Sequence, residues 1–306
     1  MEQSVLKTNL TKAPKRKKIN MTLLFVTIFL IIYVFIIYVP FYWAFLTAFK
    51  DRNQLRENIL FKFPTKWRWD NLTTVLYNFE VTYNDGVRKL TFNYLNMMWN
   101  SFSYTFVSVT VQTTCLYLTA YACAMFRYKW SGFMEAFNLF VMSTPIFGSL
   151  PSSIKVFSFL GLYENFWGIA VVTKFTWTGM YFFVVEAAVR SVPKAYVEAA
   201  QIDGAGNLSI LFRVMLPLTI NMYFILYLLN FIASWNSYGD VYVYLKSYPT
   251  AAYGLWVFDN DYSGDVSGVQ FKLAGGLLVV MPVLVLFIFF NKQLMNGLSM
   301  AEGVKE

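Results

Sequence analysis

The feature that most constrains this chain is a run from Met21 to Phe49 that contains no charged side chain. A helix needs about 20 mostly apolar residues to cross the hydrocarbon core of a bilayer. A secretory signal peptide also starts with basic residues, but its apolar core is only about 7–15 residues long. The run therefore predicts an uncleaved first transmembrane helix over residues 21–49.

The composition extends this prediction to the whole chain. Hydrophobic residues make up 57% and charged residues 14% of the 306 residues, whereas soluble domains carry about 25% charged residues. So few charges cannot cover a globular surface, and a disordered or coiled-coil chain is excluded as well. We expect an all-α polytopic membrane protein with six transmembrane helices. The five further spans are Tyr94–Phe126, Phe133–Pro151, Phe166–Val189, Met215–Ser237 and Leu273–Leu294.

The distribution of basic residues predicts the orientation. A cluster in residues 1–20 precedes the first span, and the positive-inside rule places this basic tail in the cytoplasm. Six spans then put the tail 295–306 and the loop 190–217 of the core 94–294 on the cytoplasmic side. Loops 50–93 and 238–270 are predicted to be extracytoplasmic. Loop 50–93 conflicts with the rule because it is rich in basic residues: Lys50, Arg52, Arg56, Lys62, Lys66, Arg68, Arg88 and Lys89.

Missing residue types narrow the chemistry. The chain has no histidine, which removes histidine-based catalysis and the commonest metal ligand, so no metal site is expected. Cys115 and Cys123 are eight residues apart in one apolar segment, roughly 12 Å along a helix, too far for a disulfide. The net charge of +8 is explained mainly by topology and does not require nucleic-acid binding. A membrane enzyme is therefore disfavoured, and the loop described next argues against a purely structural subunit.

The loop between the fourth and fifth spans is the most informative segment. Ser191 and Pro193 are suited to a helix start, and Gly204 is suited to a helix end because glycine tolerates positive φ. Residues 190–217 therefore predict a short helix–turn–helix that carries Glu198 and Asp203. Small alanines on one helix face would let another protein approach closely.

This loop resembles the EAA loop of ABC importer permeases. The pattern Glu-Ala-Ala, three residues, Gly, nine residues, an aliphatic residue, any residue and Leu-Pro is met by Glu198-Ala199-Ala200, Gly204, Val214 and Leu216-Pro217, with Val214 where Ile is usual. Other segments resemble the second permease of the maltose-type carbohydrate importers. They are residues 121–129 (YACAMFRYK), 161–165 (GLYEN), 234–236 (SWN) and 296–305 (NGLSMAEGVK).

The resemblance implies the type I importer permease fold in a prokaryotic cytoplasmic membrane, with both termini cytoplasmic. It implies three protein partners: a second homologous permease subunit, cytoplasmic ABC ATPase subunits and an extracytoplasmic solute-binding protein. The chain has no G-x-x-x-x-G-K-[ST] loop, so ATP and Mg would bind to the ATPase subunits and the chain would need no cofactor of its own. The residues implied to couple it to the ATPase are Glu198, Ala199, Ala200, Asp203, Gly204, Ala205, Leu216 and Pro217.

The substrate path is predicted from polar and aromatic side chains in or beside the spans, which tend to face a cavity or a neighbouring helix. The candidates are Asn100, Trp177, Tyr181, Asn230, Trp235 and Asn236. The aromatic residues Tyr248, Tyr253 and Trp256 in loop 238–270 are candidate contacts of the binding protein. An interfacial aromatic belt is the alternative interpretation of both external loops. The expected substrate is a carbohydrate, and a polyamine or a peptide is the alternative.

Overall fold

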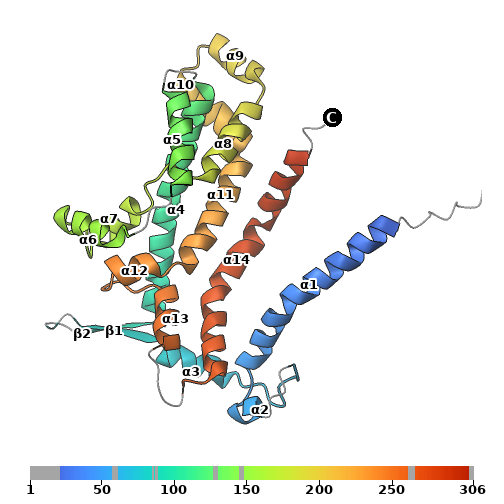
Figure 1. Cartoon of the computed structure of the whole chain (residues 1–306), viewed down its shortest axis with the longest axis vertical. Helices are drawn as coiled ribbons and strands as arrows, with labels where there is room; N and C mark the ends of the chain where they lie inside the picture. The colour runs from blue at the N-terminus through green and yellow to red at the C-terminus, as the bar shows by residue number, and fades with distance from the viewer. Residues whose placement is uncertain are drawn as a thin grey trace, which may run out of the picture.

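The computed structural model describes residues 21–56, 61–84, 86, 89–126, 130–144, 148–260 and 266–302, with Arg56 and residues 291–302 described by backbone alone. The predicted basic tail 1–20 lies outside these residues. The described chain is mostly helical, and long helices run along the longest axis of the molecule (Figure 1).

Four helices form a bundle: α4 (Tyr94–Met125), α8 (Met180–Ser191), α11 (Leu216–Asn236) and α14 (Val269–Glu302). α4 packs against α8 and α11, and α11 packs against α14. Hydrogen bonds join these helices inside the bundle, because polar groups buried there must find partners in the protein. The Tyr117 hydroxyl lies 2.6 Å from the Thr219 hydroxyl, and the Trp235 indole N–H donates to the Val279 carbonyl at 3.1 Å.

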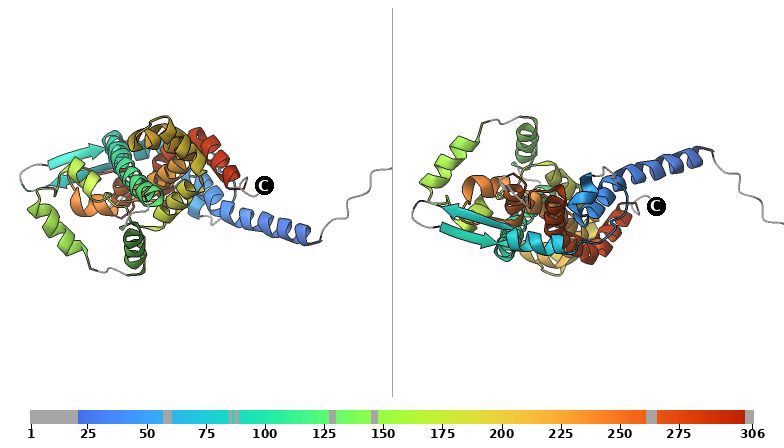
Figure 2. Two further views of the ribbon diagram at one scale, coloured as in Figure 1. Left: turned by 90° about the horizontal axis from the view of Figure 1, so that it is seen from above. Right: turned by 90° about the horizontal axis from the view of Figure 1, so that it is seen from below.

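Helix α1 (Met21–Ala48) leaves the bundle at an angle (Figure 1). Its last residues, Leu46 to Ala48, are buried, and the rest of its surface is largely exposed. The amide of Asn71 fixes this end by donating to the carbonyl oxygens of Ala48 at 2.8 Å and Lys50 at 3.0 Å. Seen along the long axis, α1 leaves on the side opposite the strands and α6 (Figure 2).

The prediction of six spanning helices is not confirmed. Among the described residues, four stretches are long and apolar enough to cross a membrane: Met21–Ala48, Tyr94–Met125, Asn207–Asn236 and Val269–Phe290. The predicted span 133–151 is divided between α5 (Ser131–Ser143) and α6 (Leu150–Phe159). The predicted span 166–189 is divided between α7 (Phe166–Val172) and α8.

Glycine and proline explain the divisions. Gly148 has φ +74° just before α6, which has Pro151 in its first turn. Gly179 has φ +124° directly before α8. Positive φ interrupts a right-handed helix, and glycine adopts it without a steric penalty. The two predicted spans are apolar, as the sequence indicated, but each contains a helix break that the hydropathy pattern does not reveal.

The lower end of the molecule in Figure 1 holds most of the two external loops. Loop 50–93 forms α2 (Arg52–Arg56), α3 (Asp70–Asn78) and an antiparallel hairpin of β1 (Glu80–Asn84) and β2 (Lys89–Asn93), paired from Glu80–Asn93 to Asn84–Lys89. Loop 238–270 forms α12 (Gly239–Tyr244) and α13 (Ala251–Asn260). The hairpin corrects the all-α prediction; β1 shows the alternating burial of a strand, not a helical period.

At the upper end lie α9 (Lys194–Ile202), α10 (Asn207–Ile210) and the π-helix η1 (Leu211–Met215), which continues into α11. The start of α1 and the end of α14 point to the same end (Figure 1). α14 continues through residue 302, so the predicted tail 295–306 begins as helix. Cys115 and Cys123, predicted not to bridge, form no disulfide.

Candidate functional site

The segment predicted to couple to an ATPase stands at the upper tip of the bundle as α9, α10 and η1 (Figure 1). The prediction of where α9 begins was wrong in detail. Ser191 is the last residue of α8, and its hydroxyl donates to the Ala188 carbonyl at 2.7 Å. Pro193 precedes α9 in an extended conformation, φ −58° and ψ 131°. The two residues therefore form the corner between α8 and α9.

The end of α9 is built as the sequence predicted. Gly204 has φ +78°, the left-handed conformation that ends a helix. The Gly204 N–H donates to the Gln201 carbonyl at 3.0 Å, and the Ala205 N–H donates to the Ala200 carbonyl at 2.9 Å. These two bonds form a Schellman motif, which satisfies carbonyls at the helix end and reverses the chain. The turn that carries Asp203 is thus fixed by the backbone of Gly204.

The inner side of this tip is anchored in the largest apolar cluster of the bundle. Ile210, Leu211 and Met215 are at most 5% exposed and pack with buried residues of α4 and α8. Ala200, Ala205 and Leu216 pack against the same cluster. A tip joined to a close-packed core moves with the helices beneath it, since protein interiors transmit strain.

The outer side of the tip is exposed and partly apolar. Ala195 and Ala199, predicted to form a small-residue face, are exposed, as are Glu198, Asp203, Gly204 and Pro217. Four larger apolar side chains are also more than half exposed: Tyr196, Ile202, Leu208 and Phe212. Ile202 is 86% exposed. Exposed apolar side chains gathered at one tip mark an interaction surface.

Glu198 lies at a cavity of about 480 Å³ between α9 and the ends of α4 and α8. Arg190 and Lys194 line the same cavity, so its rim carries both charge signs. Among the described residues no acid lies within ion-pair distance of Lys194, and no base within that distance of Glu198. The Glu198 carboxylate is therefore available to bind a group from another molecule.

η1 is a joint that the sequence did not predict. The Leu216 N–H donates to the Leu211 carbonyl, five residues back, and Pro217 follows with no N–H to donate. π-helical turns inside α-helices occur frequently at functional sites. Here the irregular turn joins α10 to the long helix α11.

A charge cluster ties α5 to α8 just below the tip. The Arg190 guanidinium lies 2.6 Å from Glu186 on its own helix and 2.9 Å from Glu135 on α5. Glu186 is 4% exposed, so its charge depends on this partner. The sequence analysis did not predict this cluster; the four-residue spacing of Glu186 and Arg190 was the available signal.

The predicted substrate-path residues do not form one site. Asn230 is buried and donates to the Thr113 hydroxyl at 3.3 Å, and Trp235 is 3% exposed inside the bundle. Asn236 is exposed and bonds its own helix. Trp177 is half-buried with its ring 6.0 Å from that of Phe137. Tyr181 is 37% exposed on α8.

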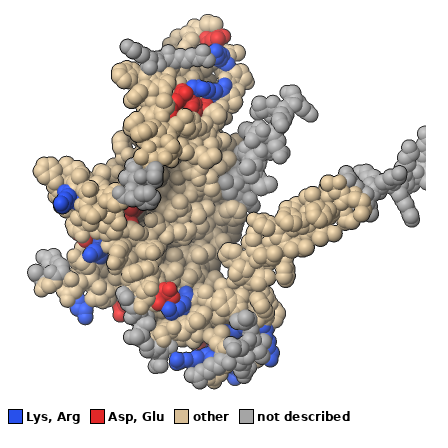
Figure 3. Space-filling model, in the orientation of Figure 1, with Lys and Arg blue, Asp and Glu red and all other residues tan. Residues whose placement is uncertain are grey.

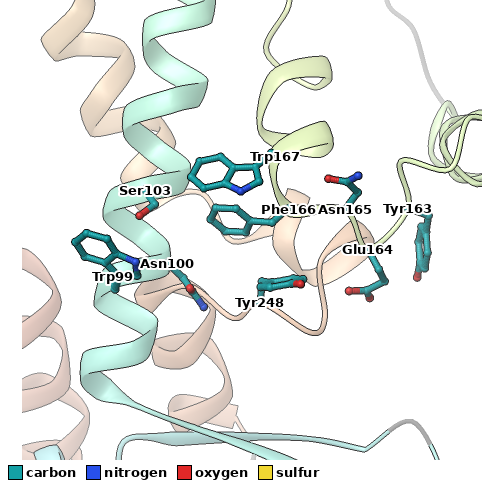
Figure 4. Close-up of a pocket in the computed structure, with 9 residues that line it drawn as sticks. All are labelled: Trp99, Asn100, Ser103, Tyr163, Glu164, Asn165, Phe166, Trp167 and Tyr248. Atoms are coloured by element: carbon teal, nitrogen blue, oxygen red, sulfur yellow. The ribbon is translucent and has the colours of Figure 1, made fainter.

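Asn100 lies instead in an open pocket of about 490 Å³ beside α4 (Figure 4). Its amide donates to the Pro249 carbonyl at 3.0 Å, and Tyr248 lines the same pocket. A predicted path residue and a predicted binding-protein contact thus come together. The sequence did not assign Trp99 and Trp167, which are 71% and 57% exposed at this pocket.

The turn below Trp167 is held tightly. Glu164 has φ +59°, a strained value for a residue with a side chain. Its carboxylate accepts from the backbone N–H groups of Lys246 and Ser247, each at 3.0 Å. These bonds join the α6–α7 turn to loop 238–270. Tyr253 and Trp256, the other predicted contacts, stack on each other in a separate aromatic cluster with Tyr238 and Tyr242.

Comparison with known proteins identifies the family to which this architecture belongs. Residues 116–299 match the family model described as binding-protein-dependent transport system inner membrane component. The galactooligosaccharide transport permease GanQ of Bacillus subtilis is 27% identical, over 92% of this chain and 95% of its own. The sn-glycerol-3-phosphate transport permease UgpE of Yersinia pestis is 25% identical, over 91% and 96%.

Solved structures agree on the fold. A chain of a bacterial ABC transporter involved in the import of the acidic polysaccharide alginate superposes with a TM-score of 0.70 at 20% identity, over 89% of this chain and 96% of that chain. The family match covers more than half of the chain and includes the tip, α11 and α14 up to residue 299. This chain therefore belongs to the family of binding-protein-dependent transport system inner membrane components, the membrane permease subunits of ABC importers.

Proposed function

We propose that the chain is one of two permease subunits in an ATP-driven, binding-protein-dependent importer of a carbohydrate, and that it forms half of the translocation pathway. The relatives named for galactooligosaccharide and maltodextrin transport support the substrate class, the latter at 27% identity over 69% of this chain. The pocket with Trp99 and Trp167 supports it too, because exposed aromatic faces beside amide and hydroxyl groups suit sugar rings.

The observation that best supports the proposal is that the outer side of the tip is exposed while its inner side is anchored in a buried cluster. α9 presents Glu198, Ala199 and Ile202 outward, while Ala200 and Ala205 are fixed to the core of α4 and α8. An ATPase subunit that gripped this tip would move the bundle as a rigid body. Such movement would open the cavity alternately to the two sides of the membrane.

In this assembly ATP and Mg bind to separate cytoplasmic ATPase subunits, and a second homologous permease and an extracytoplasmic binding protein complete the importer. The tip, the N-terminus and the C-terminus face the cytoplasm, and the hairpin with α12 and α13 faces outward. Glu198 makes the polar contact to the ATPase. Ala199 and Gly204 allow close approach, Ala200 packs α9 onto the core, Asp203 and Ala205 shape the turn, and Leu216-Pro217 joins the tip to α11.

Uptake by cells that carry the complete importer tests the substrate class. Labelled maltodextrin, galactooligosaccharide, glycerol 3-phosphate, spermidine and a dipeptide are offered to cells with and without this chain. We expect loss of carbohydrate uptake in cells that lack the chain. Loss of spermidine or dipeptide uptake alone would contradict the carbohydrate assignment.

Substitution of Glu198 tests the coupling. Glu198→Lys reverses the charge at an exposed position where folding does not depend on it, so the protein should insert and assemble normally. We expect uptake to fall at least ten-fold while the ATPase subunits still hydrolyse ATP. Gln201→Lys, which introduces the same lysine at an exposed position on the same cavity, is the control. Equal uptake by Glu198→Lys and the wild type would refute the assignment.

A further inference from the structure

The pocket beside α4 offers flat apolar surfaces to a ligand. Its volume of about 490 Å³ lies within the range of roughly 300–1,000 Å³ that small-molecule sites occupy. Trp99 and Trp167 both line it and are both more than half exposed. Figure 4 shows that the two indoles come from different helices, Trp99 from α4 and Trp167 from α7. Exposed indole faces are apolar surfaces on which the C–H groups of a sugar ring can pack.

Polar groups that suit sugar hydroxyls line the same pocket. Asn100 and Ser103 contribute an amide and a hydroxyl from α4. The Asn100 N–H group is used on the Pro249 carbonyl, so the side-chain oxygen of Asn100 remains as an acceptor. A hydroxyl such as that of Ser103 can both donate and accept.

Glu164 gives the pocket a fixed negative charge. One carboxylate oxygen accepts the Lys246 N–H and the other accepts the Ser247 N–H, which holds the group in place. A carboxylate has roughly four acceptor positions, so about two remain open to hydroxyl donors. The backbone of Glu164 is strained at φ +59°, and residues held in such conformations cluster at functional sites.

No basic side chain balances this charge within the pocket. Glu164 is the only charged residue among the nine that line it. In the described part of the chain, no base lies within ion-pair distance of Glu164; the exposed ammonium of Lys246 is farther away as well. Lys and Arg side chains gather most densely instead around α2, at the lowest end of the molecule (Figure 3). The pocket is therefore aromatic, polar and negatively charged.

From this arrangement we propose that the pocket is an external binding site of the permease for a neutral sugar, and that Glu164 excludes acidic sugars from it. The inference rests on the proposed function and narrows its substrate class. A neutral sugar packs a ring face on Trp99 or Trp167 and donates a hydroxyl to Glu164, a charge-assisted bond that is stronger than one between neutral groups. A uronate brings a second negative charge close to Glu164. Repulsion between two such charges about 4 Å apart weakens binding about five-fold in water, and more beside a protein.

Tryptophan fluorescence of the assembled importer in nanodiscs, without the binding protein, tests the site. Maltotriose and galactotriose are the neutral probes, and trigalacturonate is an acidic probe of equal length. The contribution of Trp167 is the difference between the wild type and Trp167→Phe. We expect a neutral probe to reach its half-maximal effect on Trp167 at a concentration at least about five-fold lower than trigalacturonate.

Charge removal makes the test specific. Glu164→Gln keeps the size of the side chain and an acceptor oxygen but removes the negative charge, so trigalacturonate should then act at about the same concentration as the neutral probe. Glu80→Gln, the same change at an exposed residue of β1 that does not line the pocket, should keep the preference of the wild type. If Glu164 served only to fix the turn, Glu164→Gln would weaken all three probes alike, and this result would remove its role in selection.

Equal or tighter binding of trigalacturonate to the wild type would overturn the proposal and would indicate that the exposed Lys246 sets the charge preference instead. So would a Trp167 signal that none of the three probes changes. Carbohydrate uptake that depends on this chain would still support the proposed function in either case. Loss of spermidine or dipeptide uptake alone, by contrast, would contradict the proposed function itself.

Discussion

The two ends of the bundle are built differently and are suited to different functions. The upper tip consists of three short consecutive elements, α9, α10 and η1, set on one buried cluster. The lower end is assembled from two loops far apart in sequence, which share a core that includes Val75, Phe79 and Phe258. A short contiguous tip can be bound by one partner and moved as a unit, whereas a broad composite surface can hold pockets. Changes at the tip should therefore affect coupling, and changes at the lower end should affect capture of solute.

The largest effect is expected from the turn of the tip. Gly204→Val places a β-branched residue at φ +78°, where side chains are strained, so the Schellman turn should be distorted. We expect uptake to fall about 100-fold, with ATP hydrolysis uncoupled from transport. Gly206→Ala is the control, because Gly206 has φ −74° and open space around its Cα. Similar losses in both variants would show that the turn geometry is not the cause.

A smaller effect is expected from the apolar surface of the tip. Ile202 is 86% exposed, so Ile202→Asp should leave the fold intact while placing a charge in the proposed contact with the ATPase. We expect the yield of ATPase co-purified with the permease to fall several-fold. Leu95→Asp, at a 72% exposed residue near the lower end, should not change that yield. An unchanged yield for Ile202→Asp would remove this surface from the interface.

At the lower end, substitutions should change how well the importer captures its substrate. A deletion of residues 248–255 would remove Ala251, which is fully buried and donates its N–H to the Ser101 hydroxyl at 2.7 Å. Trp167→Ala is a sharper change because that ring is 57% exposed at the pocket. We expect the KM for uptake to rise a few-fold at an unchanged ratio of ATP hydrolysed to solute moved. A changed ratio with a constant KM would contradict the division of roles between the ends.

The smallest effect concerns stability between the two ends. Arg190→Ala removes the partner of the buried Glu186 carboxylate, which raises the cost of keeping that charge inside. Because Arg190 itself is half exposed, we expect a loss of only about 1–3 kcal/mol. Thermal unfolding of the detergent-solubilised protein measures it. Glu186→Gln combined with Arg190→Ala should recover part of the loss, and no recovery would argue against charge burial as the cause.

Local patterns predicted the parts of the fold that depend on neighbours in sequence. Helix α4 begins at the predicted residue, Tyr94, and α11 is within one residue of its predicted ends. The termination of α9 at Gly204 followed from the preference of glycine for positive φ. The EAA pattern likewise identified the tip before its shape was known.

What the sequence by itself determined was the membrane class, the long apolar helices and the family motif, since these are set by hydropathy and local spacing. The tertiary structure decided what lies together. It divided two apolar runs at Gly148 and Gly179, brought Asn100 to Tyr248, and buried Trp235 and Asn230 inside the bundle. It also folded Trp67 and Trp69 back over the end of α1. Such contacts join residues tens to hundreds of positions apart, and no local periodicity encodes them, because they arise only when whole helices pack.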